Sequence, residues 1–207
     1  MFKISLENFG KKFNYEWIFR GFSYEFASGE AYAITGANGS GKSTFLQCLA
    51  GFFLQSEGKI VYSQNENNTN KIISNGDFYT YLSFAAPYQE LIEEFTLLEQ
   101  ISFHQKFKKF SQNQTAKEII KKLRLETSED KFIKNFSSGM KQRLKLGLAI
   151  YAQTPVLLLD EPTTNLDIEN IDWYKEEIKQ NLSSRLVIVC SNDANEYDFC
   201  KKIIKIS

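Results

Sequence analysis

The chain has 207 residues, 43% of them hydrophobic and 24% charged, so it is long enough to bury a core and fits a single globular domain. Its 25 basic residues balance 25 acidic ones, which leaves no net field to hold a polyanion such as DNA or an anionic bilayer by charge alone. The three cysteines, Cys48, Cys190 and Cys200, do not have the spacing of zinc ligands, and their odd number indicates reduced thiols rather than disulfides.

The first third of the chain alternates β-rich segments with turns. We expect short strands at residues 2–6, 22–26, 31–35 and 60–62. The first of these alternates apolar and polar residues and lacks the apolar stretch of a signal peptide. The polar run at 64–75 predicts a loop or hairpin, with a strand resuming near 81–85. This order predicts an antiparallel β flank ahead of the rest of the domain.

A glycine-rich loop follows the strand expected at 31–35. Residues 36–43 match G-x-x-x-x-G-K-[ST] and lead into an apolar helix from about residue 43 to 50. The glycines let the backbone curl so that N–H groups and the helix N-terminus point at phosphate oxygens. The pattern arises by chance in roughly 1% of chains this long, so we prefer a nucleotide site to a plain turn. The expected nucleotide-binding residues are Gly36, Ala37, Asn38, Gly39, Ser40, Gly41, Lys42, Ser43 and Thr44, with Lys42 on the β and γ phosphates and Ser43 on Mg²⁺.

The middle of the chain is helical and charged. Between residues 91 and 135 apolar positions recur at helical spacing among lysines and glutamates, which predicts a helical insert. The only histidine, His104, lies in this insert, where we expect a surface or packing role. Further helices are predicted near 139–152 and 168–182.

Two apolar runs predict the centre of the fold. Residues 156–159 and 186–190 are apolar without alternation, as expected of parallel strands covered on both faces, so the core is α/β. Both are far shorter than the roughly 20 residues that cross a hydrocarbon core. We therefore expect that, if the protein serves a membrane, it does so from the aqueous side and not by spanning the bilayer.

Two acids, Asp160 and Glu161, follow the first of these runs. A buried strand delivers such side chains to the edge where α/β proteins bind ligands. Asp160 suits the shell of Mg²⁺, and Glu161 suits a general base that polarises the attacking water. A solvated acidic turn is the alternative, which the phosphate-binding loop disfavours. The predicted cofactors are ATP and Mg²⁺.

A third motif lies between these two. Residues 136–143 read Phe-Ser-Ser-Gly-Met-Lys-Gln-Arg, and alone they would be only a helix N-cap. In this position they resemble the signature sequence of the ATP-binding cassette (ABC) family. The resemblance implies that Ser137, Ser138 and Gly139 grip the γ-phosphate of ATP held by the opposite subunit, with Ser137 as the key hydroxyl. Ser138 and Met140 depart from the family's usual glycine and glutamine, which bears on affinity but leaves the helix N-terminus in place.

The resemblance extends over nearly the whole chain. It implies that Gln89 is the Q-loop glutamine, a catalytic and Mg²⁺-approaching residue beside the surface that meets a transmembrane partner. It also implies that residues 165–167 form the D-loop at a dimer interface. The implied fold is a P-loop NTPase core with a mainly parallel sheet, an N-terminal antiparallel β subdomain and an inserted helical subdomain. We expect a single nucleotide-binding domain, with the core at 1–85 and 136–207 and the helical subdomain at 86–135.

Two positions are less regular. Comparison with the family pattern nominates Phe13 to stack on adenine, with Tyr15 as runner-up and core packing as the alternative. After the run 186–190, where the family usually has a switch histidine, this chain has Asn192. Asn192 offers an N–H to the γ-phosphate, but it carries no positive charge and shuttles no proton. Because loss of one pre-organised donor costs ~10²-fold or more in rate, slow hydrolysis is expected.

The resemblance implies an ATP-binding subunit that binds and hydrolyses ATP at a head-to-tail dimer interface. Its implied partners are a second cassette, the same or different, and a separate transmembrane permease, with the chain on the cytoplasmic face of the membrane. One alternative is an ABC protein acting on ribosomes or nucleic acid, although balanced charge offers no footprint for a phosphate backbone and no nucleic acid is expected. Another is a regulatory ATP-binding module with very slow turnover, which Asn192 favours and Glu161 opposes.

Overall fold

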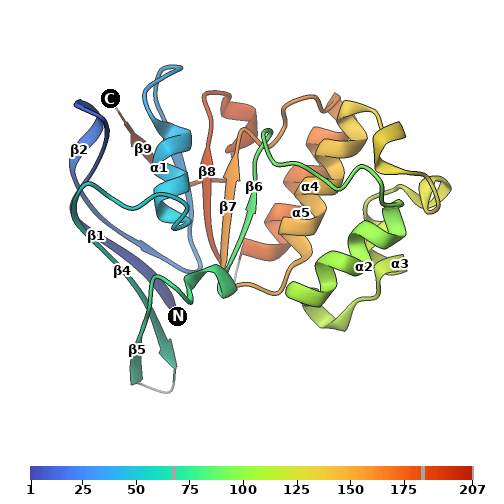
Figure 1. The fold of residues 1–207 in the computed structure, drawn as a ribbon, viewed down its shortest axis with the longest axis horizontal. Coiled ribbons are helices and arrows are strands. Elements are labelled where there is room, and N and C mark those ends of the chain that lie inside the picture. The colour runs from blue at the N-terminus through green and yellow to red at the C-terminus, as the bar shows by residue number, and fades with distance from the viewer. Residues whose placement is uncertain (67–68, 183–184, 207) are drawn as a thin grey trace.

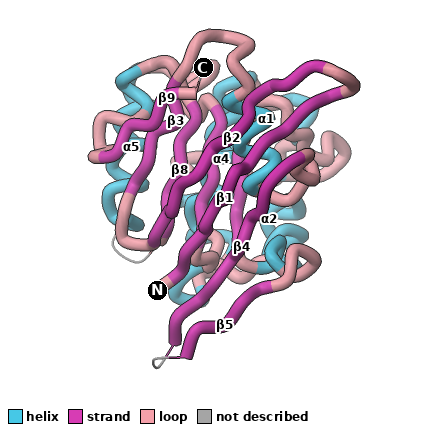
Figure 2. The backbone as a smooth tube through the Cα atoms, turned by 90° about the vertical axis from the view of Figure 1, so that its left-hand side faces the viewer, coloured by secondary structure: helices cyan, strands magenta, loops and turns pink. Residues whose placement is uncertain are grey.

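The computed structural model describes residues 1–66, 69–182 and 185–206. An antiparallel sheet forms one edge of the molecule, a parallel sheet its middle and a group of helices the other edge (Figure 1). The antiparallel sheet has the order β2-β1-β4-β5 and faces the viewer in Figure 2. Its strands are β1 (Phe2–Phe13), β2 (Glu16–Ala27), β4 (Glu57–Glu66) and β5 (Thr69–Ile73).

The antiparallel strands are longer than the sequence predicted. β1 runs past residue 6, because its pairing with β2 continues to Phe13 after a shift of register between Leu6 and Phe9. Asn8, within this shift, takes a left-handed φ of 48°. Such a bulge breaks the alternation of apolar and polar residues that marks a strand in sequence. The predicted hairpin in the polar run is confirmed by pairs from Tyr62↔Ile73 to Glu66↔Thr69, with residues 67–68 outside the described part of the chain.

The parallel sheet holds the centre of the molecule. Its order is β6-β7-β8-β3-β9, and every neighbouring pair is parallel. The apolar runs form β7 and β8, in which every residue is buried, as the sequence predicted. The closing edge strand β9 was not expected, because its four residues begin and end on exposed lysines. The strands are β3 (Ala31–Thr35), β6 (Leu82–Ala85), β7 (Val156–Asp160), β8 (Leu186–Cys190) and β9 (Lys202–Lys205).

The two faces of this sheet bury two separate cores. One core joins the antiparallel sheet and α1 (Lys42–Leu49) to side chains such as Leu158 and Ile188. The other joins the remaining helices to side chains such as Leu157 and Val187 on the opposite face. The result is the α/β fold that the sequence predicted, with α1 between the two sheets. The remaining helices are α2 (Leu97–Phe107), α3 (Ala116–Lys122), α4 (Ser138–Tyr151) and α5 (Ile168–Asn181).

The predicted helical insert contains two helices, with one short 3₁₀ turn between them and two after the second helix. Both α2 and α3 begin with a capping box, Thr96 with Glu99 and Thr115 with Glu118, which satisfies the first free N–H groups of each helix. Among the described helices, none combines the length and apolar character needed to span a bilayer.

A buried arginine fastens the amino ends of the central strands. Arg185, just before β8, is 5% exposed, and Nη1 donates to the Ile150 carbonyl oxygen at 2.6 Å. Nη2 donates to the hydroxyls of Ser83 at 2.7 Å and Thr154 at 2.8 Å. This single guanidinium therefore joins β6, the end of α4 and the residues that lead into β7 and β8.

Candidate functional site

The phosphate loop, residues 36–43, joins β3 to α1 and curves around its own lysine. Lys42 is buried, and its Nζ donates to the carbonyl oxygens of Gly36 at 2.9 Å and Ala37 at 3.1 Å. The backbone of Gly41 has a φ of 91°, and a Cβ there would lie 2.3 Å from Ile18 Cγ2. Only glycine fits at this position, at the point where the helix N-terminus opens toward the loop.

A cavity of about 270 Å³ opens at this loop. It unites most of the nucleotide-binding residues predicted from the sequence with one acid from the end of β7. Its lining residues are Ile18, Asn38, Gly39, Gly41, Lys42, Ser43, Thr44 and Glu161. The predicted loop residues and the predicted base therefore border one space.

Asp160 occupies the last position of β7, behind that cavity. It is 2% exposed, and among the described residues neither carboxylate oxygen has a hydrogen-bond partner. Burial raises the pKa of this carboxyl above its usual value, while the Ser43 hydroxyl beside it opposes the rise. An unpaired buried carboxylate is costly unless a cation completes it. A carboxylate and a hydroxyl are the oxygen donors that Mg²⁺ takes, so the two residues fit that ion.

Glu161 follows Asp160, and its backbone adopts a conformation that is rare for residues other than glycine. Its φ is 42°, held in part by a 2.9 Å hydrogen bond from its N–H to the Cys190 carbonyl oxygen. Besides the loop cavity, Glu161 borders a second cavity of about 410 Å³ that Thr163, Ser191 and Asn192 also line. The carboxylate thus stands between the phosphate loop and the segment after β8.

Asn192 touches the phosphate loop directly. Its Oδ1 accepts from the Gly36 N–H at 3.3 Å, and its Nδ2 donates to Asn38 Oδ1 at 2.7 Å. The residue expected in place of a switch histidine is therefore bound to the loop that it was predicted to serve. Its catalytic role stays a prediction.

The predicted signature residues begin α4. Ser137 is the N-cap, and its Oγ accepts from the Met140 N–H at 3.2 Å. Ser138 opens the helix, and a Cβ on Gly139 would lie 3.1 Å from the Asn165 carbonyl oxygen. The signature therefore packs on the loop at 165–167, whereas neither cavity beside Glu161 is lined by described residues 137–139. Figure 1 shows α4 and α1 on opposite faces of the parallel sheet.

The two aromatic candidates for adenine differ in their surroundings. Phe13 is 40% exposed, lies edge-on to Phe53 with ring centroids 5.4 Å apart, and has the Lys11 ammonium 4.8 Å from its ring centre. Tyr15, in the turn after β1, is 99% exposed. Adenine stacking on Phe13 stays a prediction, since no nucleotide is present.

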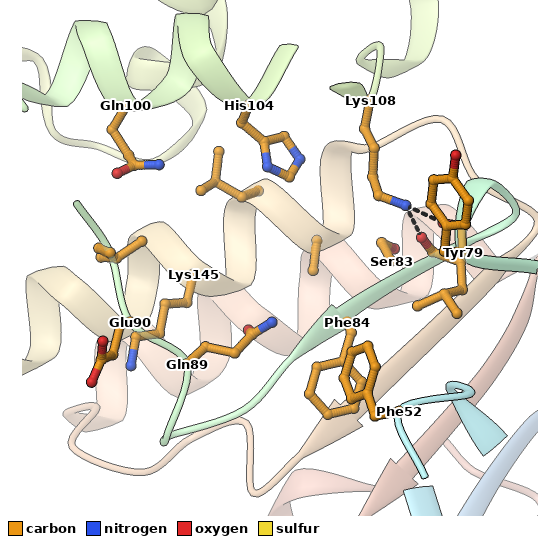
Figure 3. A pocket seen from close by; sticks show the side chains of 14 residues that line it. Phe52, Tyr79, Ser83, Phe84, Gln89, Glu90, Gln100, His104, Lys108 and Lys145 are labelled. Carbon is orange, nitrogen blue, oxygen red and sulfur yellow. Dashed lines mark hydrogen bonds between the residues drawn. The ribbon is translucent and has the colours of Figure 1, made fainter. Parts of the chain in front are cut away.

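Gln89 lies in a groove rather than at the phosphate loop. Its Oε1 accepts from the Ala86 N–H at 3.2 Å, which folds the side chain back over its own turn. Figure 3 shows Gln89 beside Lys145 and Glu90 in this groove, a cavity of about 300 Å³ between β6, α2 and α4. His104 lines the same groove, stacked on Phe110 at 5.9 Å, and burial lowers its pKa to about 4. His104 therefore packs as a neutral residue, as expected.

Sequence reasoning missed Tyr88 and Gln47. Burial raises the pKa of the Tyr88 hydroxyl to about 12, with smaller effects from the nearby Gln47 side chain and Asp160 carboxylate. Gln47 is four residues beyond Ser43 on α1, so the two share one face of that helix. The sequence signal that could have found Tyr88 is its position next to Gln89.

Known proteins resemble this chain in sequence over nearly its whole length. A family model described as "ABC transporter" matches residues 19–164. The putative hemin import ATP-binding protein HrtA of Staphylococcus aureus strain MRSA252 is 25% identical over 209 residues, covering 97% of this chain and 93% of the relative. The homologous protein of strain bovine RF122 / ET3-1 gives the same identity and coverage.

Solved structures share the fold. A dimeric post-hydrolysis state of the ATP-binding cassette MJ0796, bound to ADP and Pi, superposes with a TM-score of 0.82 at 23% identity, covering 99% of this chain and 94% of that one. A putative ABC transporter ATP-binding protein from Pyrococcus furiosus gives 0.79 at 16% identity, covering 99% and 97%. A bacterial Atm1-family exporter with ATP bound gives 0.82 at 19% identity, covering all of this chain but 37% of that one.

Proposed function

Because this chain belongs to the ABC transporter family, as an ATP-binding subunit with ATPase activity, we propose that two such cassettes close head to tail over ATP and drive a separate transmembrane subunit. The observation that carries this proposal is the edge of the parallel sheet where Lys42, Ser43 and Asp160 meet, with Glu161 in front. The buried Asp160 carboxylate has no partner there, and a metal ion bound together with the nucleotide phosphates would supply one.

The residues of the phosphate loop bind and orient the polyphosphate. The backbone N–H groups and the N-terminus of α1 face the phosphate oxygens, and the Lys42 ammonium exchanges its two carbonyl partners for the β and γ phosphates. Ser43 and Asp160 would hold Mg²⁺. When bound, that ion neutralises the charge that develops on the transferred phosphoryl group.

Glu161 acts as the general base. Its carboxylate borders the cavity at the phosphate loop, so it can accept a proton from water that approaches the γ-phosphate. The left-handed backbone at this position points the side chain forward while Asp160 before it points into the core. Asn192, already hydrogen-bonded to Gly36 and Asn38, donates to the γ-phosphate from the other side.

A second cassette completes the site. The α4 N-terminus that carries Ser137 does not border the phosphate loop of its own chain in the described residues. An exposed helix N-terminus with a serine cap binds anions, so we assign it to ATP on the opposite subunit. Because Gly139 packs against Asn165, the loop at 165–167 would move with that contact across the interface.

The transmembrane partner meets the groove between β6, α2 and α4. The groove carries exposed aromatic side chains, with Phe52 56% and Tyr79 65% exposed, beside the acidic Glu90. We therefore propose that the cassette works at the membrane surface, on the cytoplasmic side where ATP is supplied. The name of the S. aureus relative describes a transport subunit, which supports a membrane partner over a ribosomal one.

Substitution of the base tests this function. We expect Glu161→Gln to keep its affinity for a fluorescent ATP analogue and to slow phosphate release at least about 100-fold, the usual contribution of a general base. Glu176→Gln, an exposed glutamate on α5, is the matched control and should behave as the wild type. If the wild type, assayed with its membrane partner, releases phosphate no faster than Glu161→Gln, the assignment of Glu161 fails.

A further inference from the structure

The backbone of Glu161 is strained, and hydrogen bonds on either side of it hold it in place. Its φ of 42° lies in the left-handed region, which a residue with a side chain keeps only where its surroundings impose it. On the amino side, the Glu161 N–H donates to the Cys190 carbonyl oxygen at 2.9 Å. The Glu161 side chain is exposed, so its direction depends on how the next two residues, Pro162 and Thr163, are fixed.

Gln142 fixes Pro162. It lies in the second turn of α4, is 3% exposed, and its Nε2 donates to the Pro162 carbonyl oxygen at 2.8 Å. Proline has no N–H, so this carbonyl is the one backbone group through which a hydrogen bond can hold Pro162. The helix that begins with the predicted signature residues therefore holds the residue next to the proposed base.

Glu196 fixes Thr163. It ends the short 3₁₀ turn at Ala194–Glu196, after β8, and is 4% exposed. Its Oε1 accepts from the Thr163 N–H at 2.7 Å and from the Thr163 hydroxyl at 2.5 Å. A buried carboxylate is costly without donors, and Thr163 supplies two. The Tyr174 hydroxyl donates to the Glu196 carbonyl oxygen at 3.0 Å, so Glu196 is itself anchored to α5.

These contacts reach three consecutive residues from three parts of the fold. The end of β8 holds Glu161, α4 holds Pro162, and the turn after β8 holds Thr163. Among the described residues that line the cavity at the phosphate loop, neither Gln142 nor Glu196 is present. Glu196 borders the second cavity, but its Oε1 is engaged by Thr163. Any effect of these two side chains on the reaction therefore passes through the segment that they hold.

We propose that Gln142 and Glu196 are positioning residues for the general base, because they hold the segment that keeps the Glu161 carboxylate in front of the phosphate loop. This proposal rests on the proposed function and deepens it. Without either contact the segment relaxes toward an ordinary φ, and the carboxylate moves away from the attacking water. Misplacement of a reacting group by about 1 Å can cost ~100-fold in rate. Turnover should therefore fall while the phosphate loop still binds ATP.

The test is a double-variant cycle on single-turnover phosphate release, assayed with the membrane partner. We expect Glu196→Ala to slow release at least about tenfold, while its affinity for a fluorescent ATP analogue stays within about twofold of the wild type. In the Glu161→Gln background the same substitution should change the remaining rate less than about twofold, because a residue that acts only through the base has nothing left to position. Glu196→Gln keeps an acceptor oxygen for both Thr163 donors and should restore most of the rate.

Two further variants make the result specific. Gln142→Met keeps the length of the side chain and removes the amide, so it should show the same pattern as Glu196→Ala. Glu176→Ala, exposed on α5, is the matched control and should behave as the wild type. The proposal is overturned for either residue if its variant releases phosphate within about twofold of the wild type, weakens ATP binding as much as turnover, or slows the Glu161→Gln background equally. A wild type no faster than Glu161→Gln would instead overturn the proposed base.

Discussion

At the scale of the residue, Asn192 lacks the acid–base chemistry of the histidine that was expected at its position. It makes two hydrogen bonds to the phosphate loop, through Gly36 and Asn38, so in the proposed function it lies beside the bound phosphate. A carboxamide donates a hydrogen bond without changing charge, whereas an imidazole gains and loses a proton near neutral pH. We therefore expect Asn192 to support ATP binding but not proton transfer.

Substitution of Asn192 by histidine should accelerate hydrolysis. We expect Asn192→His to raise the rate of phosphate release at least about tenfold, because a proton-transferring side chain then faces the γ-phosphate. The rate of the variant should acquire a pH-dependent limb near the ordinary imidazole pKa of about 6.5, absent from the wild type. Rates between pH 5.5 and 8.5 would show this, and equal pH profiles would contradict the role assigned to position 192.

How far the site could be predicted depends on the kind of residue. The loop at 36–43 and the Asp160–Glu161 pair were placed correctly at one sheet edge, because their chemistry requires fixed spacing along the chain. Tyr88 and Gln47 were not found, because Tyr88 comes near Asp160 only through the register of β6 on β7, and Gln47 comes near Tyr88 only through the face that α1 presents. A tyrosine in a chain with 18 phenylalanines and 10 tyrosines carries no such spacing.

At the scale of the element, the contact between α3 and α4 is set by one glycine. Gly147 lies in the middle of α4, where glycine weakens a helix by about 1 kcal/mol relative to alanine. A Cβ there would lie 2.2 Å from Leu123 Cδ2, and Leu123 is fully buried. The missing side chain thus lets the end of α3 pack directly on α4.

Gly147→Ala should therefore destabilise the protein despite its higher helix propensity. Overpacking a core costs about 1–3 kcal/mol, which exceeds the gain of about 1 kcal/mol in propensity. We expect a net loss of roughly 1 kcal/mol in the free energy of unfolding, measured by urea denaturation. Leu123→Ala in the same chain should couple favourably with it, and Gly76→Ala, exposed with its nearest atom at 3.8 Å, serves as control. If Gly147→Ala is more stable than the wild type, the Leu123 side chain can move aside at little cost and the prediction is wrong.

Elements were predicted with uneven success for a physical reason. The runs that form β7 and β8 and the amphipathic helices α4 and α5 were found nearly to the residue, since burial imposes a clear pattern. β1 was cut short by its bulge at Asn8, and β9 was missed because an exposed four-residue edge strand has no apolar pattern. The division into core and helical subdomain at 86–135 stays a prediction.

At the scale of the whole molecule, the signature and the phosphate loop of one chain occupy separate surfaces. α1 and α4 pack on opposite faces of the parallel sheet, and Ser137 does not line the cavity at its own phosphate loop among the described residues. In the proposed head-to-tail arrangement one chain carries both halves of a site but cannot close them on itself, so assembly and ATP binding should be linked.

This linkage should be visible as an ATP-dependent dimer. We expect Glu161→Gln to elute as a dimer in size-exclusion chromatography with ATP and Mg²⁺, because slow hydrolysis traps the closed form, and as a monomer without nucleotide. Adding Ser137→Arg should abolish the dimer while ATP still binds each chain, since the substitution blocks only the trans contact. A dimer that persists in that double variant would contradict the head-to-tail arrangement.

The guanidinium of Arg185 makes the two ends of the parallel sheet different from each other. It fixes the amino ends of the central strands, whereas the phosphate loop, Glu161 and Asn192 all lie at the carboxyl ends, where the backbone turns freely into loops. Because these hydrogen bonds hold the amino ends together, we expect the movements that accompany ATP binding to be confined to the loops at the carboxyl ends.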